Sequence, residues 1–300
     1  MRHTHTLLYY LMTAMALAAC GGDGDSSAPG QPTETVVTAA NIEFPAARGG
    51  ASVIVRHNAT LNDRSGLKGL NYSIEWDTEI HAQRWVCYKL YNTVLAKNVQ
   101  RYSASNDGSL SSACQYPNDP DLPEQYRLTA DPYKYSGYDH GHICPSADRL
   151  CSQEANYQTF YITNMQPQGN AFNAGIWADM ETQVRLWAGN FDTLYVCKGG
   201  TIDKSTHIVK YLGSGDNKIP VPRYFFMALL GRTGNSFRAT AFWIDQTNYQ
   251  SESLRSYVFT VGELQEKTGI DFFHNLPDNI ENAAENPGHP KMQQEWSWYK

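Results

Sequence analysis

The segment from residue 138 to residue 181 brings together side chains that can transfer a proton or bind a cation. His142 ends the run Asp139-His140-Gly141-His142, and the glycine lets the backbone bend just before it. A neutral histidine can take a proton from water, which is the task of a general base. Asn173 and Glu181 offer oxygen ligands of the kind that Mg²⁺ prefers. Together these residues predict a metal-assisted hydrolysis.

Each of these residues also has an ordinary structural explanation. A single histidine such as His142 is more often structural or simply exposed than catalytic. Asn173 could cap a helix, and Asn164 could be a turn residue after an apolar segment. Glu181 and Arg185 could form a surface ion pair at four-residue spacing, which contributes little stability. Their occurrence together, in this order and spacing, favours the functional interpretation.

The surrounding sequence predicts an α+β fold, with a mixed or antiparallel β-sheet and flanking helices. Runs of β-branched and aromatic residues predict strands at Ser52–Arg56, Asn71–Trp76, Arg84–Tyr91, Thr159–Thr163, Thr193–Cys197, Arg223–Leu230 and Ser236–Ile244. Apolar residues recur at three- and four-residue spacing between Ala174 and Ala188, which predicts an amphipathic helix. Thr260 and Glu263 could form a capping box for a short helix that Gly269 ends. We expect one domain over residues 45–300.

Composition and charge narrow the class of protein. The chain has 300 residues, of which 41% are hydrophobic and 18% charged, as in globular rather than disordered proteins. A formal net charge of −6 argues against a protein that wraps nucleic acid through many lysine and arginine contacts with phosphates. The same charge is compatible with an enzyme, because an enzyme needs only a local positive cleft and must release its product.

The N-terminus predicts export and lipid attachment. A basic residue precedes an apolar run from Leu7 to Ala19 that is too short to span a bilayer, and Leu17-Ala18-Ala19-Cys20 resembles a bacterial lipoprotein box. We expect a signal peptide over residues 1–19, a lipid on Cys20, and a flexible tether over residues 20–44. The alternative is an ordinary secretory signal with a chance cysteine. The body would be a domain anchored to the bacterial cell envelope, on its periplasmic or its outer side.

Exported chains can form disulfides. Removal of Cys20 leaves an odd number of cysteines, so at least one stays unpaired within the chain. Cys144 with Cys151, and Cys87 with Cys114, are guesses at pairs, because connectivity cannot be read from the sequence. The five cysteines of the mature chain are Cys87, Cys114, Cys144, Cys151 and Cys197.

A structural zinc site is a rival explanation for the histidines. His140, His142 and Cys144 alternate, so they would face the same side of a regular strand. With Cys151 they would offer four ligands of the kind that zinc takes. Pro145 disturbs such a strand, and exported cysteines tend to form disulfides, so we regard zinc as the weaker interpretation.

The same segments resemble the DNA/RNA non-specific endonuclease family, whose ββα-metal core carries an Asp-Arg-Gly-His motif. In this chain the motif corresponds to residues 139–142, Asn164 ends a strand-like segment, and Asn173 to Glu181 opens the helix. The resemblance covers nearly all of residues 50–280, which makes it more specific than a short motif. It extends to flanking segments at Arg84-Trp85-Val86, Leu194–Gly200, Ile219–Pro222 and Thr268–Phe273.

The resemblance implies a role for each candidate. His142 would be the general base, and Asn173 would be the protein ligand of a hydrated Mg²⁺, with Mn²⁺ as a substitute. Glu181 would hold a water of that ion, Asn164 would orient the base and the phosphate, and Arg185 would face the scissile phosphate. The implied activity is hydrolysis of phosphodiester bonds in DNA and RNA without sequence specificity, with 3′-hydroxyl and 5′-phosphate products.

One departure from the family concerns His140, which stands where the motif has arginine. Arginine is always charged and binds phosphate through a planar fork, whereas histidine is cationic only at lower pH. His140 could still contact the phosphate as a catalytic residue, or Arg185 or Arg149 could take over that contact. The alternative is a catalytically weakened relative that acts as a surface-tethered binding lipoprotein, and turnover of nucleic acid distinguishes the two.

Overall fold

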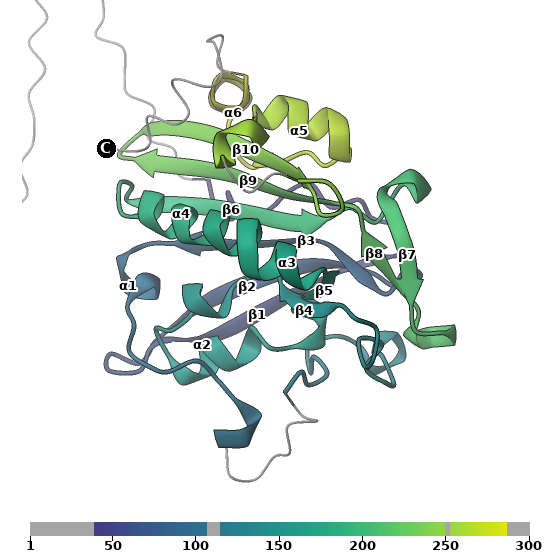
Figure 1. Ribbon diagram of the computed structural model, residues 1–300. Coiled ribbons are helices and arrows are strands. Elements are labelled where there is room, and N and C mark those ends of the chain that lie inside the picture. Colours follow the sequence, from purple (N-terminus) through teal and green to yellow (C-terminus); the bar gives the residue numbers. More distant parts are fainter. Residues whose placement is uncertain (1–38, 107–114, 250–252, 287–300) are drawn as a thin grey trace, which may run out of the picture. The chain divides into compact units, whose positions relative to one another are not determined.

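A seven-stranded antiparallel sheet forms the centre of the fold (Figure 1). The computed structural model describes residues 39–106, 115–249 and 253–286. The strand order is β1-β2-β3-β6-β9-β10-β11, with β1 at Ser52–Asn62, β2 at Leu67–Asp77, β3 at Ala82–Leu90, β6 at Thr193–Gly200, β9 at Tyr224–Thr233, β10 at Ser236–Asp245 and β11 at Val258–Phe259. With the helices described next, this confirms the predicted α+β class.

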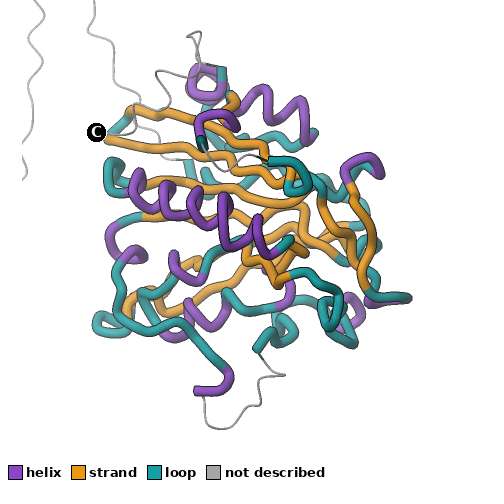
Figure 2. The backbone as a smooth tube through the Cα atoms, viewed as in Figure 1, coloured by secondary structure: helices purple, strands orange, loops and turns teal. Residues whose placement is uncertain are grey.

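Both faces of the sheet are buried. Successive residues of a strand point to opposite faces, and Val86 and Tyr88 of β3 belong to one apolar cluster while Trp85 and Cys87 belong to another. Helix α4 contributes to the first cluster, and α5 and α6 contribute to the second. Figure 2 shows the helical segment that ends in α4 lying over the strands. The α-helices are α1 Asn92–Leu95, α2 Gln153–Gln158, α3 Asn170–Phe172, α4 Ala178–Ala188, α5 Val261–Thr268 and α6 Asp278–Glu285.

Two short antiparallel strand pairs form sheets of their own. We call both of them hairpins, although the chain passes through α2 between β4 and β5. Their strands are β4 at Asp139–His142, β5 at Met165–Gln168, β7 at Ile208–Leu212 and β8 at Ile219–Pro222. The β4–β5 hairpin places His142 opposite Met165, and the helical segment that begins at Asn170 follows at once. This strand–strand–helix unit is the ββα motif that the resemblance implies.

One side chain fastens the β4–β5 hairpin to the main sheet. Gln166 donates to the backbone oxygens of Gln83 at 3.0 Å and Gly200 at 3.3 Å, and its Oε1 accepts from the Gly200 amide at 2.5 Å. Within the hairpin, Gly141 is required by close packing, because a Cβ there would lie 2.3 Å from the Gln168 side chain. A buried amide that satisfies three backbone groups holds the hairpin firmly against β3 and β6.

Most predicted elements are present, with one exception. Six of the seven predicted strands lie in β1, β2, β3, β6, β9 and β10. The predicted strand Thr159–Thr163 is wrong, because the chain there leaves α2 and enters a 3₁₀ turn at Ile162–Asn164. Its apolar residues Phe160, Tyr161 and Ile162 are all buried between α2 and the end of this turn, so they do not alternate between two faces. The capping box at Thr260 is confirmed, and Gly269 ends α5 with a φ of 73°.

The folded body begins before the predicted boundary at residue 45. Ile42 and Phe44 are buried in the cluster that α5 and α6 cover, so the end of the predicted tether belongs to the fold. The predicted signal peptide and Cys20 lie outside the described residues. In the part of the chain that the structure describes, every helix is too short or too polar to cross a membrane.

Candidate active site

A pocket of about 450 Å³ opens beside the β4–β5 hairpin and the start of the long helical segment. Four of the predicted site residues line it, namely His140, His142, Asn173 and Glu181. The other two predicted residues, Asn164 and Arg185, are not among the residues that line it. The structure therefore brings together most of the predicted set, and it adds side chains that the sequence pattern did not indicate.

His142 is held in its neutral form. Its ring packs edge-on against Phe160, with ring centroids 4.8 Å apart. Burial, together with the positive charge of Arg101, lowers the pKa of His142 to about 3. Its Nε2 atom is buried and has no hydrogen-bond partner among the described residues. A neutral imidazole with an unpaired nitrogen can accept a proton, as a general base does, but a pKa this far below neutral pH makes it a weak base.

Asn173 is not the helix cap that its position suggested. The helical segment starts at Asn170 and passes through a π-helical turn, residues 173–177, before α4 begins. The backbone of Gly175 inside this turn is non-helical, with φ −103° and ψ −115°. Nδ2 of Asn173 donates to Asp139 Oδ2 at 3.0 Å, which leaves the amide oxygen as the atom for a cation. Such irregular turns inside helices are common at functional sites.

Asp139 is a carboxylate of the pocket that we did not assign a role from the sequence. Its Oδ2 accepts hydrogen bonds from the side-chain amides of Asn170 and Asn173, both at 3.0 Å. These two bonds orient the carboxylate on the pocket wall. Asp139 and Asn173 thus offer adjacent oxygens, the donor type that suits a hard divalent cation.

Glu181 forms a buried ion pair with Lys198. The Nζ atom of Lys198 lies 2.7 Å from Glu181 Oε1, and the lysine side chain is 1% exposed. The ammonium group also lies 4.7 Å from the centre of the Trp177 ring. Burial raises the pKa of Glu181, and Lys198 opposes this effect. Lys198 was missed from the sequence, although a lysine that ends the apolar run Leu194–Cys197 was the available signal.

Asn164 and Arg185 make other contacts. The side-chain oxygen of Asn164 accepts from the Cys144 amide at 2.8 Å, and its nitrogen donates to the backbone oxygens of Cys144 and Thr159. Asn164 thus fixes the chain after β4 and is not among the residues that line the pocket. Arg185 pairs with the buried Asp148 at 2.9 Å, which raises the pKa of the guanidinium. Asn164 holds the backbone two residues after His142, and Arg185 is engaged by Asp148; the predicted roles of both residues towards the phosphate stay predictions.

His140 is built into the wall of the pocket. Its ring stacks between Tyr116 and Tyr133, with centroid distances of 3.8 Å and 4.1 Å. Its Nε2 lies 3.1 Å from Asp131 Oδ1, so the ring is held on three sides. Arg149 cannot replace it as a phosphate contact, because that side chain is 1% exposed and donates to backbone oxygens.

Arg101 is the cation that the sequence pattern missed. It lies on the pocket wall, and its guanidinium sits 4.8 Å from the centre of the Phe160 ring. Burial lowers the pKa of Arg101, but an arginine remains charged at neutral pH. It lies far from the motif in sequence and on no periodic element, so no local spacing could have indicated it. The pocket wall thus includes a cation besides Asp139 and Glu181, even though His140 replaces the family arginine.

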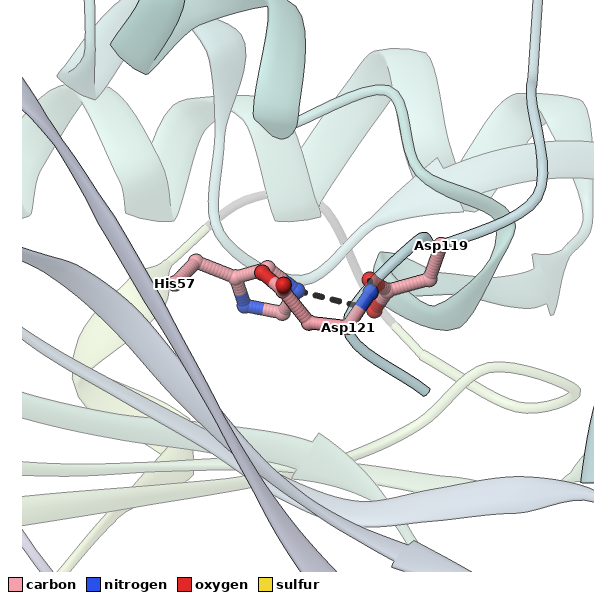
Figure 3. A group of neighbouring side chains, drawn as sticks. All are labelled: His57, Asp119 and Asp121. Atoms are coloured by element: carbon pink, nitrogen blue, oxygen red, sulfur yellow. Dashed lines mark hydrogen bonds and ion pairs between the residues drawn. The ribbon is translucent and has the colours of Figure 1, made fainter. Parts of the chain in front are cut away.

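The described part of the chain does not form the alternative zinc site of His140, His142, Cys144 and Cys151. Cys144 and Cys151 are buried free thiols within the core, so the guessed disulfide between them is wrong. Cys87 is also a free thiol, and its guessed partner Cys114 lies outside the described residues. Within residues 39–106, 115–249 and 253–286, the cluster His57, Asp119 and Asp121 is the one group with metal-ligand spacing (Figure 3).

That cluster is mainly a hydrogen-bonded clamp. Asp119 Oδ2 accepts from His57 Nε2 at 2.8 Å and from the Thr163 hydroxyl at 2.5 Å, and Oδ1 accepts from the Asp121 amide at 2.9 Å. Both carboxylate oxygens of Asp119 are therefore in use. The clamp ties β1 to the 3₁₀ turn that carries Asn164. None of its members lines the pocket.

Comparisons with known proteins show the family to which this chain is similar. The family described as DNA/RNA non-specific endonuclease matches residues 50–279. A nuclease of Syncephalastrum racemosum is 33% identical over 175 residues, which cover 54% of this chain and 55% of that protein. The mitochondrial nuclease EXOG of Danio rerio is 26% identical over 216 residues, which cover 69% and 60%. This chain thus spans little more than half the length of these relatives.

A solved structure has the same fold. A chain in the crystal structure of the EndoG/EndoGI complex superposes with a TM-score of 0.58 at 24% sequence identity. The superposition covers 70% of this chain and 85% of that chain.

Proposed function

Because this chain belongs to the DNA/RNA non-specific endonuclease family, we propose that it hydrolyses phosphodiester bonds in DNA and RNA with the help of a divalent cation. The observation that carries the proposal is one pocket in which neutral His142, the free oxygen of Asn173 and the cation of Arg101 face a common space. A base, a metal ligand and a phosphate-binding cation are the parts that this reaction needs.

The pocket suits Mg²⁺, with Mn²⁺ as a substitute. Asn173 would hold the ion through its amide oxygen, and the carboxylate of Asp139 lies beside it. When bound, the ion supplies Lewis-acid polarisation of the phosphate and neutralises charge on the leaving oxygen. Glu181, paired with Lys198, lines the same pocket, where its carboxylate would hold a water of the ion.

The side chains of this protein would divide the remaining work. His142 accepts a proton from the attacking water while the water oxygen forms its bond to phosphorus. The bond from phosphorus to the 3′ oxygen breaks and that oxygen takes a proton from solvent water, so the products carry a 3′-hydroxyl and a 5′-phosphate. Arg101 binds a non-bridging phosphate oxygen and stabilises the charge that develops there. His140 lies on the same wall, where it can donate to the phosphate when protonated.

Degradation of plasmid DNA and of RNA, with and without chelator, tests this proposal. The wild type should degrade both, chelator should abolish the activity, and added Mg²⁺ or Mn²⁺ should restore it. His142→Ala is the matched control, because it removes the base and leaves the predicted metal ligand in place. Binding without turnover under all metal conditions would instead support the weakened, surface-tethered binding relative.

We further propose that the protein is an exported lipoprotein, since Leu17-Ala18-Ala19-Cys20 and a polar stretch precede the folded body. Cleavage before Cys20 would leave the lipid on that residue and hold the nuclease at the envelope. Mass spectrometry of the mature protein should find an acylated N-terminal cysteine, and Cys20→Ala should prevent acylation. A mature terminus at another residue would refute this part of the proposal.

A further inference from the structure

The loop before β4 holds a tyrosine in an unusual state. Tyr135 is 96% exposed, although aromatic rings are normally at least partly buried. Its backbone has a φ of 60°, a conformation that costs energy for a bulky residue. Three residues later Tyr138 lines the pocket. The loop thus places an aromatic ring in solvent, under backbone strain, three residues before a residue that lines the candidate active site.

Lysines accompany both rings. The Nζ atom of Lys134 lies 5.3 Å from the centre of the Tyr135 ring, and that of Lys210 on β7 lies 4.8 Å from the centre of the Tyr138 ring. Each of the two tyrosines is thus accompanied by a positive charge, in a chain whose formal net charge is −6, and one of these tyrosines, Tyr138, lines the pocket. We name Lys134, Tyr135, Tyr138 and Lys210 the tyrosine ledge.

The carboxylates near the ledge already have partners. Asp131 is paired with His140, and Asp139 accepts hydrogen bonds from Asn170 and Asn173. Asp139 therefore competes only weakly for the two lysines, whereas Asp131 also attracts Lys134. The ledge combines an exposed ring with cations, which is the chemistry that binds unpaired nucleotides: bases stack on aromatic rings, and lysines contact the phosphates between them.

We propose that the tyrosine ledge binds the single-stranded part of a nucleic-acid substrate where it leaves the pocket. A base stacks on Tyr135, while Lys134 and Lys210 contact the flanking phosphates. The ligand is a single strand because only an unpaired base exposes its face to a side-chain ring. This inference rests on the proposed nuclease function, since it extends the substrate path of the same pocket.

Binding of a short single-stranded oligonucleotide in the presence of chelator tests the ledge without turnover. Fluorescence anisotropy of the full chain should show that Tyr135→Ala weakens binding by about 5- to 100-fold, the range measured for base–aromatic stacking. Tyr135→Phe should bind like the wild type. Tyr135→Gly should bind as weakly as Tyr135→Ala, although glycine relieves the strain of the positive φ. That pair of variants separates loss of the ring from damage to the loop.

Tyr211→Ala is the matched control. Tyr211 is also exposed and also lies under a lysine, Lys218, at 4.3 Å. It neighbours Lys210 on β7, and successive strand residues point to opposite faces, so its ring faces away from the ledge. This variant should bind as the wild type does. An equal loss in Tyr211→Ala, or wild-type binding by Tyr135→Ala, overturns the proposal.

The salt dependence of binding provides a second readout. Lys134→Gln and Lys210→Gln should each reduce the slope of log affinity against log salt by about 0.7, the value for one phosphate contact of a single strand. Unchanged slopes would exclude both lysines from the path of the strand.

The outcomes separate the ledge from the catalytic proposal. If the wild type binds the single strand through Tyr135 but cleaves nothing with any metal, the nuclease proposal fails and the ledge stands. If the wild type cleaves nucleic acid and the Tyr135 variants bind the single strand as the wild type does, the ledge proposal fails and the nuclease proposal stands. If the wild type does not bind the single strand, the proposal for the tyrosine ledge is also overturned.

Discussion

Replacement of Lys198 by methionine tests whether Glu181 works as an ionised carboxylate. Methionine has a similar length and keeps the apolar contacts, but it removes the ammonium group that lies 2.7 Å from Glu181 Oε1. Burial already raises the pKa of Glu181, and Lys198 opposes that effect. Without Lys198 the pKa must rise further, so a larger share of Glu181 is protonated at any given pH.

The size of the effect follows from the contact that is lost. A hydrogen bond to a charged group is worth about 1.5–3 kcal/mol, so its loss favours protonated Glu181 by roughly 10- to 100-fold. Glu181 can act as an ionised carboxylate only above its pKa. In Lys198→Met, the acidic limb of the profile of activity against pH should therefore move toward alkaline pH. His142 cannot produce this limb near neutral pH, because its pKa is about 3.

The assay is the pH dependence of kcat/KM for plasmid DNA at saturating Mg²⁺, together with thermal unfolding. Lys198→Arg keeps a cation and should retain most of the wild-type profile. Lys198→Met should also be less stable, whereas the double variant Lys198→Met/Glu181→Gln should regain stability, because it leaves no unpaired buried charge. Identical pH profiles for the wild type and Lys198→Met would refute the reasoning and reduce Lys198 to a structural residue.

Three further predictions concern other groups of the chain. His142→Ala should lower kcat by about 10²- to 10⁴-fold and keep the affinity for the metal. Asn173→Ala should instead raise the Mg²⁺ concentration needed for activity. Calorimetric titration of the metal distinguishes these two effects. His140→Arg should raise activity above neutral pH, because a guanidinium stays charged there and can stack between Tyr116 and Tyr133. An unchanged pH profile would show that His140 does not contact the phosphate. Burial raises the pKa of Glu285 to about 8, so the folded state binds its proton more tightly than the unfolded chain, and stability falls as pH rises from the ordinary glutamate pKa towards that value. Glu285→Gln should therefore raise the melting temperature at alkaline pH and leave it nearly unchanged in acid.

Local sequence patterns predicted much of the main sheet, because its strands are runs of β-branched and aromatic residues. They did not predict β5 or β8, whose residues Met165–Gln168 and Ile219–Pro222 contain prolines and little alternation. These short strands exist because the neighbouring strand and the core hold them in place. Tertiary packing, rather than local propensity, decides such segments.

In the candidate site, too, local sequence patterns predicted some residues, and tertiary packing decided the others. His142, Asn173 and Glu181 lie on one compact ββα unit, so their spacing was enough to bring them together. Arg101 and Lys198 come from distant segments; no local pattern indicated Arg101, and the only local signal for Lys198 was its place at the end of an apolar run. Asn164 and Arg185 have the expected sequence positions, but their partners, the Cys144 backbone and Asp148, are neighbours only in the folded chain.

The Gln166 bridge has a thermodynamic consequence for the candidate site. Because this side chain joins the β4–β5 hairpin to both β3 and β6, the strand that carries His142 cannot move independently of a sheet that is buried on both faces. The entropy of ordering the hairpin is therefore lost once, when the protein folds, and not again each time a substrate binds. The general base would meet its substrate already preorganised, and substrate binding energy remains for distorting the phosphate.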